Sequence, residues 1–160
     1  MRHRHRAALM GWCVACLVWA PAGCTSVVPE ALRGEVDRRL TYAQLAQAPE
    51  SYRGRLVLVG GEVLRVGFAG PDLELTLAER PLSPLDESPM LGLASRGDLV
   101  VRVPGGGRAA LREGDVLTVV GVVLGREAAN DAGSVPRLEA RHIQVWPAGS
   151  LQPYPAEPGW

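Results

Sequence analysis

Lysine is absent from this chain of 160 residues, whose 17 basic residues are all arginine. This absence excludes chemistry that needs a lysine amine, such as a Schiff base or the phosphate-binding lysine of a P-loop. Aromatic residues make up only 5% of the chain, and the 17 basic residues balance 17 acidic ones. Binding of single-stranded nucleic acid needs a positive groove and aromatic stacking platforms, so the composition gives no reason to expect a nucleic-acid partner.

Long hydrophobic runs are also missing. The longest apolar stretch, residues 7–20, has 14 residues without a charge, which is fewer than the ~20 that a membrane-spanning helix needs. Three arginines precede this stretch within residues 1–6, and small residues follow it. A basic start, a short apolar run and a small-residue end are the parts of a secretory signal, which we place at residues 1–23. A permanent N-terminal anchor is the alternative interpretation.

The end of the signal is compatible with two kinds of cleavage. Ala22-Gly23-Cys24 is the small-small-Cys end of a bacterial lipobox, whose cysteine is diacylated and becomes the new N-terminus. Pro21 stands where a lipobox commonly has an aliphatic residue. Ala20-Pro21-Ala22 is also an ordinary A-x-A cleavage motif, which would release a soluble periplasmic protein.

Cysteine usage favours the lipobox. Cys13 and Cys16 lie in the apolar run and leave with the signal, so Cys24 is the one cysteine of the mature chain. A lone thiol is anomalous in an oxidising compartment, because it invites mispairing. Acylation would explain it, so we predict that membrane lipid is a partner through Cys24. Thr25 follows the cysteine; Asp at this position would retain a lipoprotein at the inner membrane, so Thr25 predicts sorting to the outer membrane.

The mature chain reads as one domain with two extended ends. Residues 24–40 are interpreted as the lipidated N-terminus and a tether, with a weak helix over residues 30–39. Thr41 and Gln44 have capping-box spacing, which predicts a short helix at the start of a domain over residues 41–146. Four prolines predict an extended tail over residues 147–160.

Five segments carry strand patterns, and no long helix separates them. Two of the strands contain glycines, at Gly60-Gly61 and at Gly121, where a bulge or bend is expected. The predicted fold class is therefore all-β, a small five-stranded OB-like barrel, with a sandwich as the alternative. The strands are predicted at residues 55–66, 73–77, 99–103, 116–124 and 138–145.

One loop, residues 80–97, is longer than most connections, and loops of this length are usually functional or mobile. Its apolar residues Met90, Leu91 and Leu93 either cap the barrel end or form a surface for an envelope protein partner.

The chain gives little sign of catalysis. His142 is the one histidine of the mature chain, and no serine lies in a G-x-S-x-G elbow. A metal site needs several His, Cys or clustered carboxylate ligands. Asp86-Glu87 is interpreted as part of a solvated turn. We expect no cofactor, no metal and no enzymatic activity, although an unrecognised envelope enzyme is an alternative.

An ordered set of short motifs resembles the Slp family, the starvation-inducible outer-membrane lipoproteins of Gram-negative bacteria. The similarity covers most of residues 24–146. Besides the lipobox cysteine, the set comprises Tyr52-Arg53-Gly54, Gly60-Gly61-Glu62-Val63, Pro81-Leu82, Ser95-Arg96-Gly97 and Thr118-Val119-Val120-Gly121. The resemblance implies a lipid anchor in the outer membrane, a link to stress or starvation, and a structural or binding role. We expect the domain to face the periplasm.

Overall fold

The computed structural model describes residues 26–106, 110–129, 133–147 and 151. Cys24 and Thr25, and most of the predicted tail at residues 147–160, lie outside the described residues. In the described part of the chain, no helix has the length and apolar character needed to cross a bilayer.

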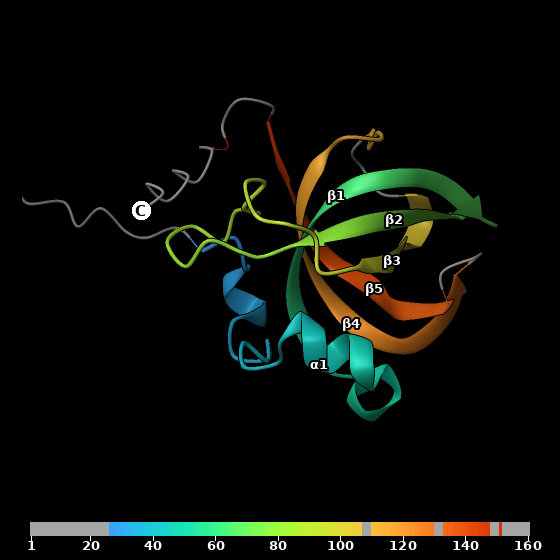
Figure 1. The fold of residues 1–160 in the computed structure, drawn as a ribbon, viewed down its shortest axis with the longest axis horizontal. Helices are drawn as coiled ribbons and strands as arrows, with labels where there is room; N and C mark the ends of the chain where they lie inside the picture. Colours follow the sequence, from blue (N-terminus) through green and yellow to red (C-terminus); the bar gives the residue numbers. More distant parts are fainter. Residues whose placement is uncertain (1–25, 107–109, 130–132, 148–150, 152–160) are drawn as a thin grey trace, which may run out of the picture.

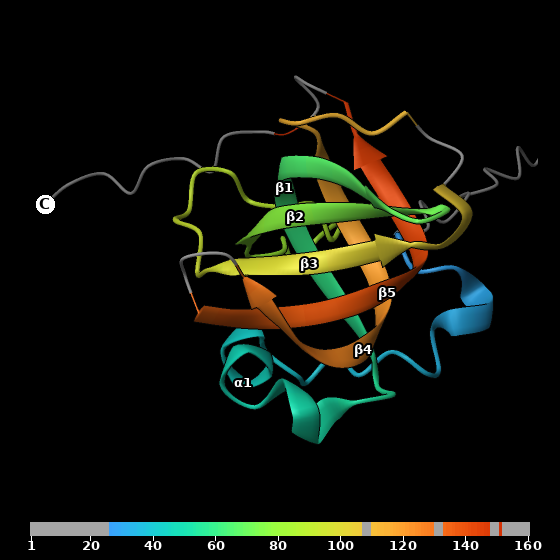
Figure 2. The same cartoon turned by 90° about the vertical axis from the view of Figure 1, so that its right-hand side faces the viewer.

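Five strands form a closed barrel in the order β1-β2-β3-β5-β4, and β4 pairs back with β1 (Figures 1 and 2). Neighbouring strands are antiparallel except β3 and β5, which are parallel. This arrangement confirms the predicted all-β five-stranded barrel. The strands are β1 (Leu56–Ala69), β2 (Asp72–Arg80), β3 (Asp98–Val103), β4 (Val116–Ala129) and β5 (Gly133–Trp146).

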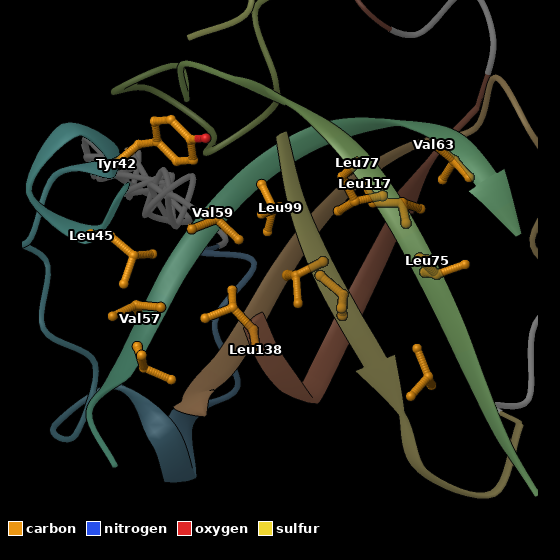
Figure 3. Packing of buried hydrophobic residues seen from close by; sticks show 14 of the residues in the cluster. Tyr42, Leu45, Val57, Val59, Val63, Leu75, Leu77, Leu99, Leu117 and Leu138 are labelled. Atoms are coloured by element: carbon orange, nitrogen blue, oxygen red, sulfur yellow. The ribbon is translucent and has the colours of Figure 1, made fainter. Parts of the chain in front are cut away.

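The barrel interior is filled by leucine and valine from alternate strand positions. Leu73, Leu75 and Leu77 of β2 point inward and are buried, while Glu74 and Thr76 between them are partly exposed. This is the period of two that the sequence shows, because successive strand side chains point to opposite faces. Figure 3 shows how these side chains meet in the interior. The buried cluster comprises Tyr42, Leu45, Val57, Val59, Val63, Leu73, Leu75, Leu77, Leu99, Val101, Val103, Leu117, Val119, Val123 and Leu138.

The glycine pair in β1 allows a close approach of two strands. A Cβ atom on Gly61 would lie 2.9 Å from the carbonyl oxygen of Ala78, and one on Gly60 would lie 2.9 Å from that of Arg80. The pairing of β1 with β2 is regular at both glycines and shifts at Leu64, between Val63 and Arg65. The bulge expected at the glycine pair thus lies at Leu64 instead, and the glycines are required because a Cβ atom would clash with β2.

The alternation of β5 breaks beside His142 because of a second register shift. Val120 pairs with His142 and Gly121 pairs with Ala140, so Arg141 is the extra residue. Gly121 lies at this shift, where an added Cβ would come within 3.2 Å of the Glu139 carbonyl oxygen. The second predicted irregularity thus coincides with a glycine.

One barrel end is covered by the short helix α1 (Tyr42–Gln47), which follows the predicted capping box. The Gln44 amide donates to the Thr41 hydroxyl, and the Thr41 amide donates to the Gln44 side chain at 3.0 Å. Tyr42 and Leu45 of this helix join the buried cluster (Figure 3). The 3-10 turn η2 (Pro49–Tyr52) then leads into β1.

Candidate functional site

The N-terminal segment, residues 26–40, lies against the outside of the barrel. It begins with a 3-10 turn, η1 (Glu30–Leu32), in place of the expected helix over residues 30–39. Val28 is fully buried, and Val36 forms a parallel bridge with Leu56 at the start of β1. These contacts, together with Val120 of β4, form a second apolar cluster outside the barrel interior. The described part of the expected tether is therefore packed on the domain.

Glu87, from the long loop between β2 and β3, holds the first residues of this segment. Its carboxylate accepts hydrogen bonds from the Ser26 hydroxyl at 2.9 Å and from the Val27 amide at 2.8 Å. Arg38, farther along the same segment, forms an ion pair with the other carboxylate oxygen. We call these four residues the Glu87 clamp. In Figure 1 the loop and the N-terminal segment lie on the same side of the barrel.

The backbone of Glu87 is itself held by the barrel. Its φ is +61°, the left-handed region, which costs of order 1–3 kcal/mol for a residue other than glycine. The hydroxyl of the fully buried Thr118 donates to the Glu87 carbonyl oxygen at 2.7 Å, and the Trp146 indole donates to that hydroxyl at 2.9 Å. This hydrogen-bonded chain from β5 through β4 to the loop offsets the strain.

The charge of Glu87 is stabilised by its partners. Burial acts to raise the pKa of this carboxyl, but the hydrogen bonds from Arg38, Ser26 and Val27 outweigh it and place the pKa below its ordinary value. Glu87 is therefore ionised at neutral pH, and the clamp is a charged contact with matched partners.

A groove runs along the clamp and over the edge of α1. It consists of hollows of about 540, 220 and 140 Å³, which all have Leu40 in their walls. Leu58 and Leu82 line the middle part together with Glu87. Arg39 lines the largest hollow and has no ion pair with any described residue. We call this feature the N-terminal groove.

The far end of the groove holds a second paired carboxylate. Glu79 is only 2% exposed, and the Arg96 guanidinium binds both of its oxygens. The same guanidinium lies over the ring of Tyr42, whose hydroxyl donates to the Asp98 carbonyl oxygen at 2.8 Å. Burial, with the negative charges of Glu79 and Asp98, raises the pKa of Tyr42 to about 12. Tyr42 is therefore neutral and serves as a hydrogen-bond donor.

The residues singled out in the sequence lie in different places. Leu91 and Leu93 are exposed and Met90 is partly buried, and none of the three belongs to the buried cluster. The barrel end described above is covered by α1 and not by these three residues. Their role as a partner surface stays a prediction. His142 lies at the β5 register shift and does not line the groove.

Glu87 was missed by sequence reasoning. Its neighbour Asp86 does behave as a turn residue, because its carboxylate accepts from the Ser88 amide and hydroxyl. Glu87 instead turns back to the N-terminal segment, about sixty positions earlier in the chain. A Glu in a proline-rich loop carries no local pattern that would identify such a contact.

The geometry suits binding and positioning. Within the described ranges, no three His, Cys, Asp or Glu side chains gather closely enough to hold a metal ion. The groove carboxylates Asp37, Glu79 and Glu87 are each paired with an arginine. These ion pairs hold neighbouring segments of the chain together.

Comparison with known proteins identifies a matching protein family. A sequence model described as "Outer membrane lipoprotein Slp family" matches residues 22–160. No curated protein matches this chain. Among solved structures, an OBody bound to hen egg-white lysozyme is 17% identical, with a TM-score of 0.39, and the match covers 68% of this chain and 94% of that one. That similarity is too low to bear on function.

Proposed function

This chain belongs to the outer membrane lipoprotein Slp family, and from that membership we propose that acyl chains on Cys24 anchor it in the outer membrane. The chain is thus an outer-membrane lipoprotein. The observation that carries the proposed attachment is the extent of the family match, which starts at residue 22 and so includes Cys24 and all that follows. Two or three long acyl chains give effectively permanent attachment, because each buried methylene contributes about 0.8 kcal/mol.

We propose that the barrel acts in the periplasm as a structural or binding domain without catalysis. The N-terminal groove supports a binding role, because it combines apolar walls at Leu40, Leu58 and Leu82 with Arg39, a cation that lacks an ion pair among the described residues. The pairing of the groove carboxylates supports the absence of catalysis, since a general acid or base must be free to exchange its proton.

We propose, finally, that the protein serves cells under starvation or stress, which rests on the resemblance to starvation-inducible members of the family. Its amount relative to a constitutive outer-membrane lipoprotein should rise as cells enter stationary phase. A constant ratio through growth and starvation would contradict this part of the proposal.

The attachment is tested by labelling cells with a palmitate analogue and separating their membranes. Cys24→Ser should abolish labelling and remove the domain from the outer-membrane fraction. Cys16→Ser is the matched control, because it removes a thiol from the signal and should leave labelling intact. A wild-type protein that is soluble, unlabelled and begins at Gly23 would establish the A-x-A cleavage and contradict the anchor.

A further inference from the structure

The Glu87 clamp leaves very little free chain between the acylated cysteine and the folded domain. Ser26 and Val27 are already bonded to Glu87, and Val28 is fully buried. Two residues of extended chain span at most about 7 Å, so the Cα atoms of Cys24 and Ser26 cannot be farther apart than this. If residues 24–40 were instead a free extended tether, the domain could lie up to about 55 Å from Cys24.

The short span brings the domain to the lipid. The acyl chains enter the hydrocarbon layer, so Cys24 lies at the level of the headgroups, a region about 5–7 Å thick on each side of the bilayer. Ser26 therefore lies within roughly one headgroup thickness of Cys24. The side of the domain that carries the Glu87 clamp must then face the membrane surface.

Two exposed side chains flank the clamp and suit such a surface. Leu85 is 87% exposed and lies two residues before Glu87. Arg33 is exposed, donates to the Val28 carbonyl oxygen at 3.1 Å, and has no ion pair with a described residue. An apolar side chain that enters the interface, beside a guanidinium that meets lipid phosphate, is a common arrangement at membrane surfaces.

We propose that the Glu87 clamp holds the barrel directly against the phospholipid leaflet that carries its acyl chains, with Leu85 in the lipid interface and Arg33 at the phosphates. This inference rests on the proposed lipidation of Cys24. Beyond lipidation, the inference specifies the orientation of the domain: the Glu87 clamp faces the lipid, and the turn between β1 and β2 points away from it.

The orientation can be measured with one label. The mature chain has no cysteine other than Cys24, so Pro84→Cys introduces a unique free thiol beside Leu85. The full lipidated protein is labelled there with a fluorophore and reconstituted into vesicles of phosphatidylethanolamine and phosphatidylglycerol that contain a headgroup-nitroxide lipid. Phe68→Cys is the control, because residue 68 is 77% exposed and about 26 Å along β1 from Gly60, which lies beside the loop residue Leu82.

We expect the nitroxide lipid to quench the label at residue 84 and to leave the label at residue 68 unchanged. A second protein carries a Gly-Ser insert of roughly six residues after Thr25, which adds about 20 Å of reach without altering the clamp. The insert should abolish the quenching at residue 84. The same insert after Leu151 is its control and should have no effect.

The outcomes separate the two proposals. Protein that fails to float with vesicles overturns both the lipid anchor and this orientation. Protein that floats while residue 84 is no more quenched than residue 68 overturns the orientation alone, as does quenching that survives the insert after Thr25. Leu85→Cys provides a second label position should Pro84→Cys lower the melting temperature.

Discussion

The hydroxyl of Thr118 donates a hydrogen bond to the carbonyl oxygen of Glu87 across 31 positions of sequence, at 2.7 Å. Through this contact, a buried side chain of β4 holds the strained backbone of the residue that binds the N-terminal segment. The stability of the barrel and the position of the chain next to Cys24 are thereby coupled.

Thr118→Val tests that coupling, because it keeps the shape of the side chain and removes the hydroxyl. The Trp146 indole and the Glu87 carbonyl would then lose their partner, at a cost of about 1–3 kcal/mol. A melting temperature lower by several degrees is expected for the domain. Thr118→Ser, which keeps the hydroxyl and removes the methyl group, is the control and reports the cost of lost packing alone. A Thr118→Val protein that melts like the parent would contradict the coupling.

The charge of Glu87 predicts that the stability of the folded domain depends on pH. The pKa of this carboxyl is lower in the folded protein than in the unfolded chain, so its contribution is full at neutral pH and is lost as pH falls below about 4. Glu87→Gln should destabilise the domain at pH 7 by about 1–3 kcal/mol and by less at pH 3. Denaturant titrations at the two pH values measure the difference. Glu35→Gln, at an exposed glutamate, is the matched control, and an effect of Glu87→Gln that does not change with pH would refute the charged clamp.

The Glu79–Arg96 pair predicts that a second substitution restores part of the stability lost when Arg96 is removed. Arg96→Ala leaves a buried carboxylate without its partner and should cost on the order of 1–3 kcal/mol. Adding Glu79→Gln removes the buried charge, so the double variant should be more stable than Arg96→Ala alone. Thermal melts of the three proteins provide the comparison. A double variant less stable than Arg96→Ala would show that the charge of Glu79 is not the source of the loss.

The close approach at Gly61 predicts a steric penalty. A methyl group there would meet the Ala78 carbonyl oxygen at 2.9 Å, so Gly61→Ala should destabilise the barrel by about 1–3 kcal/mol. Gly34 has nothing within 4 Å of an added Cβ, which makes Gly34→Ala the control. Equal melting temperatures for the two variants would contradict the packing described for β1 and β2.

The sequence predicted those parts of the structure that depend on local patterns. The alternation of Leu73, Leu75 and Leu77 identified a strand, and Thr41 with Gln44 identified the start of α1, because each signal spans only a few residues. The closed barrel followed from five such strands and the absence of a long helix.

The N-terminal segment was not predictable in the same way. Val28 and Val36 are eight positions apart, a spacing that fits one face of a helix and one face of a strand equally well, so the pattern could not identify a segment that has only a 3-10 turn. Their burial depends on Leu56 and Val120, which come from distant parts of the chain. The bond between Glu87 and Val27 is equally non-local. The candidate site thus required the three-dimensional structure, whereas the barrel did not.

The parallel pairing of β3 with β5 has a consequence for encounters between copies of this protein. A sheet with open edges offers unpaired amides and carbonyls, on which a neighbouring copy can add its own strand. Closure of the described strands into a ring gives every strand a paired neighbour on both sides over part of its length, so none is a free edge strand. Copies of this domain that meet are therefore expected to contact one another through side-chain surfaces more than through added strands.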